Sequence, residues 1–397
     1  MNHKEDFTKI VRDAGIPTTE EEMQAQWNQI NEDQDSLIKN DNKWSSFWRL
    51  VSALVTAPAM WVVQFLINEL LPNSFIKTAE GTFLEILAWG LKISRKPAVK
   101  TKGKITFTRD QISNAVVVPA GTRIQSPAIN GNVYELVTLA DTPFPDNQLT
   151  VEVEAEAAEA GEGWNLAPGY FSILPEPVTG VVSVRNDDDW IIQPGDEAET
   201  DEELQLRCRN QFTAVGEFHH DAAYRAIIAE FAAIRVDYIW FEHGAPRGEG
   251  SANAYIMIDS GAPDQPFVTG INTHINDNGY HGHGDDMQCF PMPEKGYALS
   301  PDAYLNPNLT EAQQNQLLSD IENMIRSAFR ENSDYTVTKS WPFSRFSFSK
   351  LSEELHAQFP DLVSIEFNRD DIVNDMELPV ISSLAIKKQV AMGGVAL

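Results

Sequence analysis

The feature that most constrains the fold of this chain is a strict alternation of apolar and polar residues over positions 149–157. The apolar set is Leu149, Val151, Val153, Ala155 and Ala157, and the polar set is Thr150, Glu152, Glu154 and Glu156. Successive side chains of a β-strand point to opposite faces of the sheet. A period of two therefore predicts a strand with one buried face and one acidic face.

Similar short runs occur throughout residues 97–192. They cover residues 104–108, 115–122, 133–138 and 180–186, and prolines and glycines separate them. Such punctuation is typical of turns between strands. Several short strands in close succession predict a small β-sandwich or barrel.

An acidic turn then changes the pattern from strands to a mixture of helices and strands. Thr200 is expected to cap a helix, with Glu203 three residues later completing a capping box. The pattern predicts further helices at 221–233 and 267–275, and strands at 236–242, 253–259 and 287–292.

The last hundred residues repeat this alternation. Thr310 and Gln313 predict a capping box in front of a helix that ends near residue 330. A second helix is expected at 347–358, with strands at 335–338, 362–367 and 379–387.

The N-terminal region, residues 1–96, is predicted to be helical and is rich in tryptophan: Trp27, Trp44, Trp48, Trp61 and Trp89 lie there. Thr18 with Glu21 is the expected start of one helix. Pro58 is expected to bend a second helix and Pro72 to end it, and a third helix is expected at 78–94. Tryptophans in so short a region need a facing surface, which is either an ordinary three-helix core or a partner protein.

The run at 50–67 is mostly apolar and reaches the lower limit for a helix that crosses a bilayer. Ser52, Thr56, Pro58, Gln64 and the nearby Glu69 argue against a membrane span. Helices that are apolar on most of their surface are more often buried in a bundle. The N-terminal region is too small to bury this run, so we expect a partner helix.

We therefore predict a multi-domain α+β fold with an N-terminal helical arm, a β-rich middle domain and C-terminal α+β modules. The expected boundaries are 1–96 for the arm, 97–197 for the β-rich domain, 198–299 for the first α+β domain and 300–397 for the second.

The net charge of −28 argues against nucleic acid as a ligand, because phosphate binding needs an excess of Lys and Arg. The charges are unevenly distributed. Residues 124–184 contain no Lys or Arg, whereas residues 86–109 contain seven Lys and Arg and no acid. Two interpretations remain open: two solvated faces, or a basic segment that meets the acidic module of a neighbouring subunit and so steers assembly.

The two cysteines, Cys208 and Cys289, indicate a fold that does not rely on disulfides. Both are expected to be buried as small hydrophobic residues. The first residues lack the apolar segment of a signal peptide.

The best candidate for a metal site is the loop that holds His281, His283, Asp285 and Asp286. Its spacing matches no metal site that we can assign, and its glycines fit a flexible loop equally well. His219 and His220 are weaker candidates. Asp187, Asp188 and Asp189 lack the alternate spacing and turn glycine of a calcium loop.

The sequence contains no G-x-S-x-G motif, no phosphate-binding loop and no dinucleotide-binding fingerprint. With 58 acidic residues, a pair of carboxylates carries no information without geometry. We expect no enzymatic activity, no cofactor and no bound metal.

Several motifs in succession resemble the baseplate J-like family of contractile-tailed phages. They are Val-Pro-Ala-Gly-Thr at 118–122, Gly-Val-Val-Ser-Val-Arg-Asn at 180–186, and the acidic helix start at 195–207. The helix at 78–90 is also similar, although Glu85 stands where the family usually has Asp. A glycine-rich segment at 279–286 follows as it does there, and the resemblance covers roughly residues 75–390.

The resemblance implies a structural wedge subunit of a contractile phage tail or a phage-derived particle. Its partners would be other baseplate wedge proteins, copies of itself, and hub and sheath-proximal proteins, with no nucleic acid and no membrane span. The subunit would be assembled in the host cytoplasm as part of a homo- and hetero-oligomer. The helical arm, at 50–71 and 78–93, would bundle with a second wedge protein. The expected interface residues are Trp44, Trp48, Trp61, Phe65, Leu66, Leu70, Leu84, Leu87, Leu91, Lys92, Arg95 and Lys96.

Two other classes remain open at this point. One is a surface-binding protein of the fibre or adhesin type, which would usually show sequence repeats. The other is a metal-dependent enzyme that uses the loop from His281 to Asp286.

Overall fold

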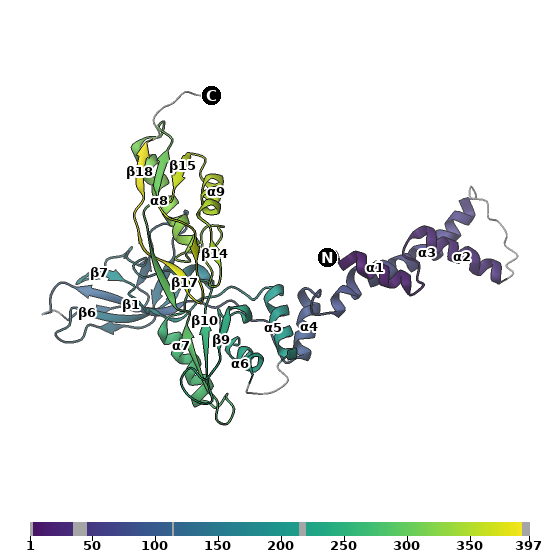
Figure 1. Ribbon diagram of the computed structural model, residues 1–397, viewed down its shortest axis with the longest axis horizontal. Helices are drawn as coiled ribbons and strands as arrows, with labels where there is room; N and C mark the ends of the chain where they lie inside the picture. Colours follow the sequence, from purple (N-terminus) through teal and green to yellow (C-terminus); the bar gives the residue numbers. More distant parts are fainter. Residues whose placement is uncertain (1–2, 35–45, 113–114, 214–219, 391–397) are drawn as a thin grey trace. The chain divides into compact units, whose positions relative to one another are not determined.

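The computed structural model describes residues 3–34, 46–112, 115–213 and 220–390. They form two compact units. The first comprises the chain up to residue 95 together with 200–209, and the second comprises 96–199 and the chain from 210. The first unit is made of helices, and the second combines a β-rich part with α+β parts (Figure 1). The predicted α+β class is confirmed, while the division into four domains stays a prediction.

The helical unit follows the expected order of helices. It contains α1 (His3–Asp13), α2 (Glu20–Asp33), α3 (Ser46–Phe65), the π-helical turn η1 (Leu66–Leu70), the 3₁₀ turn η2 (Pro72–Ser74), α4 (Gly81–Gly90) and the first part of α5 (Asp201–Thr213). α3 remains helical on both sides of Pro58, and Pro72 follows the end of the helical run as expected. α4 is shorter than the predicted helix at 78–94, because Lys92 has a positive φ of 61° that a helix cannot continue through.

The capping box of α2 lies one residue later than predicted. Thr19, not Thr18, accepts a hydrogen bond from the backbone N–H of Glu22, and Glu22 accepts from the backbone N–H of Thr19. Both threonines have a glutamate three residues on, so spacing alone did not separate them. Thr18 Oγ1 is instead engaged by Arg12 Nη2 at 2.9 Å. Hydrogen bonds from the Thr18 backbone hold the pKa of Glu22 below its usual value.

Replacing Thr19 by alanine is expected to weaken α2 by about 1 kcal/mol, because the backbone N–H of Glu22 loses its side-chain acceptor. Hydrogen exchange of the first amides of α2 measures the effect. Thr18→Ser, which keeps a hydroxyl for Arg12, is the control and should leave the exchange unchanged. Equal exchange in Thr19→Ala and wild type would contradict the assignment of the cap.

Two small cores hold the helical unit together. The first joins α1 to the end of α3 through Phe7, Val11, Val63 and Ile67. The second joins α4 to α5 and consists of Ala79, Leu84, Ala88, Leu204 and Cys208. Asp201 at the start of α5 accepts hydrogen bonds from Gly81 N at 2.9 Å and Arg95 Nη2 at 2.6 Å. These bonds lower the pKa of Asp201.

The β-rich part is a near-closed barrel. A six-stranded sheet has the order β3-β4-β6-β1-β7, and β8 also pairs with β1. Its strands are β1 (Lys102–Arg109), β3 (Arg123–Gln125), β4 (Glu135–Thr138), β6 (Thr150–Ala157), β7 (Val181–Arg185) and β8 (Ile191–Gln193), and β2 (Val117–Val118) pairs with β5 (Thr142–Pro143). The apolar face of β6 packs in the barrel core as predicted, with Val151 opposite Phe107 and Val153 opposite Ile105.

The α+β parts of the second unit follow. One three-stranded sheet, β11-β10-β9, consists of β9 (Ile239–Glu242), β10 (Ser251–Ile256) and β11 (Asp286–Pro291), accompanied by α6 (Asp221–Ile228), α7 (Gln265–Asn272), η4 (Val236–Tyr238) and η5 (Thr273–Asp277). Later come β12 (Glu294–Leu299), β13 (Asp302–Leu305), α8 (Glu311–Ala328), β14 (Arg345–Phe346), α9 (Phe348–Gln358), β15 (Leu362–Glu366), β16 (Ile372–Val373), β17 (Leu378–Leu384) and β18 (Lys387–Val390).

Both predicted capping boxes in these parts are confirmed, at Thr200 with Glu203 and at Thr310 with Gln313. One strand prediction is wrong, and another is confirmed only for part of its length. Residues 335–338 form no strand, because side chains bind the segment: Glu354 accepts from both the backbone and the hydroxyl of Thr338. The run at 379–387 is divided between β17 and β18, which pair with different strands.

Polar contacts join the barrel to the C-terminal part within the second unit. Asp334 Oδ1 accepts from Tyr134 O–H at 2.6 Å and from Asn132 Nδ2 at 2.9 Å. Burial and this hydrogen bond raise the pKa of Tyr134 well above its usual value. The barrel therefore has a fixed neighbour inside its own chain.

Candidate subunit interface

α3 carries a stripe of large apolar side chains on its exposed face. Phe47, Leu50, Leu54, Trp61 and Phe65 are all exposed, with Leu54 at 73% and Trp61 at 69%. Their spacings of three, four and seven residues place them on one side of an α-helix. Trp61 and Phe65 stack with ring centroids 5.9 Å apart. We call these five residues the α3 stripe.

The opposite side of α3 is the buried one. Ser52, Thr56 and Val63 are buried there, followed by Ile67 in η1. Thr56 O–H donates to the carbonyl of Ser52 at 2.9 Å, so its hydroxyl is satisfied within the helix. The buried side of α3 thus carries the small polar residues Ser52 and Thr56 as well as Val63, and the side with the largest aromatic and aliphatic residues is exposed.

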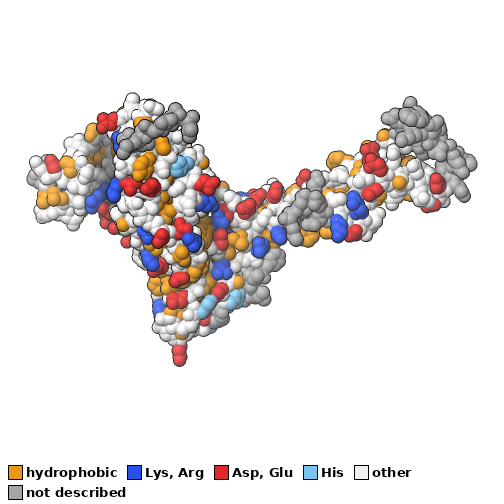
Figure 2. Space-filling view, turned by 45° about the horizontal axis from the view of Figure 1, so that its top comes forward, with side chains coloured by type: hydrophobic (Ala, Val, Ile, Leu, Met, Phe, Trp, Pro, Cys, Tyr) orange, Lys and Arg blue, Asp and Glu red, His pale blue; other side chains and the backbone are white. Residues whose placement is uncertain are grey.

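α4 repeats this arrangement on a smaller scale. Leu84 and Ala88 face α5, whereas Phe83, Ile86 and Trp89 are exposed, with Trp89 at 79%. Hydrophobic side chains are visible on the surface of the helical unit (Figure 2). Exposed apolar surface of this extent is typical of protein–protein or membrane contact.

The structure separates the predicted interface residues into three groups. Trp61, Phe65, Leu70 and Lys92 are exposed; Leu66, Leu87, Leu91, Arg95 and Lys96 are half-buried; Leu84 is buried. Trp44 and the side chain of Trp48 lie outside the described residues. The interface predicted from the sequence did not include Phe47, Leu50 and Leu54. Their spacing relative to Trp61 already indicated that they share one side of the helix.

The two basic residues at the end of this region have partners within the chain. Arg95 pairs with Asp201 and, at 3.0 Å, with Glu85. Lys96 Nζ donates to the carbonyls of Phe231 and Ile234, each at 2.9 Å. Both positive charges are therefore engaged by acceptors within this chain.

The same is true of the basic segment that follows. β1 and β6 are neighbours, so Lys100 and Lys102 pair with Glu156, at 3.3 and 3.0 Å, and Lys104 pairs with Glu152. Hydrogen bonding to Lys102 lowers the pKa of Glu156. The basic and acidic stretches meet within one chain, which accounts for these lysines without a neighbouring subunit.

One described helix, residues 50–70, is long and apolar enough to cross a bilayer by length and composition. Of its apolar 18-residue window, only 22% is buried within the chain. A helix of a bundle passes the same test, so this property alone does not assign a membrane role, and the predicted absence of a span stays a prediction.

The loop at 281–286 does not assemble as a metal site. Asp285 accepts from Tyr224 O–H at 2.6 Å, and Asp286 pairs with Arg247, whose guanidinium also reaches Asn253. Within the described ranges, no group of three or more His, Cys, Asp and Glu side chains is arranged to hold a metal ion. Tyr224 instead fastens this loop to α6, and Arg247 fastens it to the connection between β9 and β10.

The remaining chemical candidates have structural roles. His220 is the N-cap of α6 and accepts from Ala223 N, while His219 lies outside the described residues. Asp187 accepts from Thr106 O–H at 2.6 Å. Cys208 and Cys289 are buried, as predicted, and neither takes part in a disulfide; burial raises the pKa of Cys289 to about 12.

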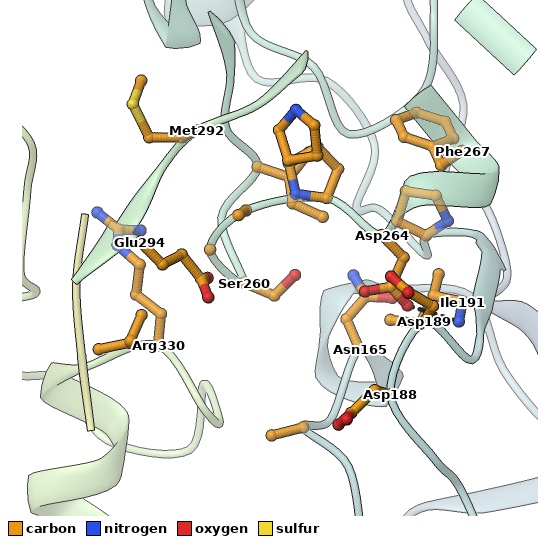
Figure 3. Close-up of a pocket in the computed structure, with 18 of the residues that line it drawn as sticks. Asn165, Asp188, Asp189, Ile191, Ser260, Asp264, Phe267, Met292, Glu294 and Arg330 are labelled. Atoms are coloured by element: carbon orange, nitrogen blue, oxygen red, sulfur yellow. Dashed lines mark hydrogen bonds between the residues drawn. The ribbon is translucent and has the colours of Figure 1, made fainter. Parts of the chain in front are cut away.

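A cleft with a volume of about 950 Å³ lies between the barrel and the α+β parts of the second unit. Figure 3 shows Asp188, Asp189 and Asp264 on one wall and Glu294 and Arg330 on another. Asp264 Oδ2 accepts from Ile191 N at 2.7 Å. Burial raises the pKa of Asp264 to about 6.

Comparison with known proteins identifies the family to which this chain belongs. Residues 104–193, which contain most of the barrel, match the barrel domain of baseplate J-like proteins. The protein gp29 of Haemophilus phage HP1, which is named as a baseplate protein, is 38% identical over 364 residues, covering 89% of this chain and 92% of gp29. Baseplate protein gp47 of Escherichia phage Mu is 39% identical over 95 residues, 24% of each chain.

Among solved structures, a chain of the sixfold-symmetrised cryo-EM structure of the anti-feeding prophage baseplate aligns with 86% of this chain and 84% of its own length, at a TM-score of 0.29 and 9% identity. The assignment rests on the sequence relatives, and above all on the nearly full-length match to gp29. The family consists of structural proteins rather than enzymes. The chain therefore belongs to the baseplate J-like family and is a structural protein of a phage tail baseplate.

Proposed function

We propose that this protein is a wedge subunit of a contractile tail. In this role it forms part of the ring around the central hub and couples attachment to contraction of the sheath. Its partners are other wedge proteins, further copies of itself, and hub and sheath-proximal proteins. The helical unit makes the contact with the other wedge proteins.

The observation that carries the proposal is the α3 stripe. A helix gains most from burying its large apolar side chains, yet this chain buries the side with Ser52 and Thr56 and exposes the side with Leu54 and Trp61. Such a helix is completed by a second apolar helix that packs against it. Aromatic residues at the centre of an interface contribute most of its binding energy.

The proposed mechanism is mechanical. Contacts between subunits hold the ring in the state that precedes attachment, and engagement of the fibres shifts the modules as rigid bodies. Packed interfaces have discrete alternative arrangements rather than a continuous range. A change at one point of the ring is therefore passed on as a switch between two states.

Electron microscopy of particles that carry an epitope tag on this chain tests the proposal. A tag at the C-terminus leaves the helical unit untouched. Antibody label in a ring at the distal end of the tail is the expected result. Label on radiating fibres would favour a surface-binding protein, which a carbohydrate-binding assay would then examine. Label in a membrane fraction rather than in particles would assign the helix at 50–70 to a bilayer.

A further inference from the structure

The turn at residues 341–344, in front of β14, holds an aromatic residue in a backbone conformation that such residues rarely adopt. Phe343 has a φ of 53°, in the left-handed region. Glycine, asparagine and aspartate tolerate this region, whereas a bulky side chain is strained there. Of the eight non-glycine residues with a positive φ in the described part of the chain, three are Asn or Asp, and Phe343 is the only aromatic one.

The surrounding structure holds Phe343 in this conformation. Its backbone N–H donates to the carbonyl of Asp375 at 2.7 Å. Pro342 on one side is buried, and Ser344 on the other side donates its hydroxyl to the carbonyl of Trp341 at 2.6 Å. Backbone strain that is fixed in this way occurs mainly where a protein binds a ligand or switches state. The position of the Phe343 side chain is therefore informative.

The strained turn presents the Phe343 ring to solvent. The residue is 55% exposed, so burial in the chain's own core does not offset the strain. Arg345 and Val373, which lie opposite each other in the β14–β16 pair, are exposed as well, with Val373 at 68%. Asp375 is also exposed, whereas the other two residues of the β14–β16 pair are buried. We call Phe343, Arg345, Val373 and Asp375 the Phe343 patch.

One charge of the Phe343 patch is paired within the chain and the other is not. Arg345 Nε pairs with Asp371 Oδ2 at 2.9 Å. The carboxylate of Asp375 takes part in no ion pair or hydrogen bond with the described residues. Lys295, whose charge acts on Asp375 from a distance, is paired with Glu377 at 3.0 Å. The patch therefore combines two exposed apolar side chains with a carboxylate that can accept from an outside cation.

We propose that the Phe343 patch docks a different protein of the baseplate. The partner has an apolar pocket for Phe343 and Val373, and a Lys or Arg at its rim for Asp375. A second copy of this chain carries the same net charge of −28 and would be repelled, so the charges favour a basic protein of another kind. The patch belongs to the second unit and the α3 stripe to the first, and the docking holds wherever the subunit lies in the baseplate.

Replacing Phe343 by glycine separates docking from folding, because the two expected effects have opposite signs. Glycine adopts a positive φ without strain, so we expect the Tm of the full-length chain to rise by about 2 °C. The same variant lacks the aromatic anchor, so the number of complete tails formed after complementation should fall by about tenfold or more. Electron microscopy counts the tails, and thermal unfolding of the purified chain gives the Tm.

Two further variants make the test specific. Ala245→Gly is the matched control for the strain, because Ala245 is exposed and has a φ of 59° but lies outside the Phe343 patch. It should form tails at the wild-type level. Val373→Lys sets a positive charge against the basic partner and should lower the number of tails, with a Tm within about 2 °C of wild type. A Phe343→Gly variant that assembles normally, or that has a Tm below wild type, would overturn the docking role.

A photo-cross-linking residue, p-benzoylphenylalanine, in place of Phe343 identifies the partner in assembled particles. Irradiation should link this position to a different tail protein, and mass spectrometry should find the link in a segment with apolar residues beside a Lys or Arg. A link to another copy of this chain, a link to an acidic segment, or no link in particles that form normally would each rule out the proposed partner.

Discussion

Replacing Trp61 and Phe65 together by aspartate is expected to abolish the formation of complete tails while the isolated chain stays folded. Both side chains are exposed and stack on each other, so the chain's own core does not depend on them. Aromatic residues at the centre of an interface each contribute about 2 kcal/mol or more. Losing both costs about 4 kcal/mol, which is roughly a thousandfold in affinity for the partner helix.

The measurement has two parts. Tail particles are counted and examined by electron microscopy after complementation with the variant, and the Tm of the purified chain is compared with wild type. Trp61→Phe with Phe65→Leu is the matched control, because it keeps an apolar stripe and should restore assembly in most particles. Contraction-competent particles that form at the wild-type level with both aspartates would rule out α3 as an assembly helix.

Replacing Gly103 by alanine is expected to give the largest loss of stability from the smallest change in the barrel. A Cβ at this position would lie 2.5 Å from the ring atom Cε3 of Trp190 and still closer to the Trp190 carbonyl oxygen. That carbonyl accepts from Lys104 N, and the Trp190 indole donates to Leu166 O, so neither group is free to move away. We expect a loss of about 3 kcal/mol in the free energy of unfolding.

Chemical denaturation of the second unit within the full chain measures this loss. Gly270→Ala, in α7, is the matched control because a Cβ there would meet nothing within 4 Å. Since alanine favours a helix over glycine, this control should gain about 0.5–1 kcal/mol. A Gly103→Ala variant as stable as the control would mean that Trp190 does not pack against β1 as described.

Much of the fold was predictable because local patterns carry it. The alternation at 149–157 became β6 with its apolar side in the barrel core. Thr200 and Thr310 opened their helices with the capping boxes that their spacing indicated. Periodicity and caps depend on neighbours within a few residues, which is why a single sequence is sufficient to identify them.

The misses share one physical cause. Residues 335–338 have the composition of a strand, yet Glu354, which lies 16 residues further along, binds Thr338 and no strand pairs with the segment. Thr18 and Thr19 are equivalent as caps until Arg12 engages Thr18. In both cases a contact from elsewhere in the chain decided between local alternatives of similar energy.

The candidate interface shows the same difference between local properties, which the sequence reveals, and contacts between distant residues, which it does not. The sequence alone identified a helical arm, its apolar run and its aromatic residues, because helix propensity and apolar composition are local properties. α1 packs against Val63 and Ile67, and this tertiary contact determines which side of α3 is buried. The pairing of the basic segment with Glu152 and Glu156, and the hydrogen bond from Ile191 N to Asp264, join residues far apart in sequence. Only the tertiary structure decided these contacts, because their energies exist only once the strands and helices have been brought together.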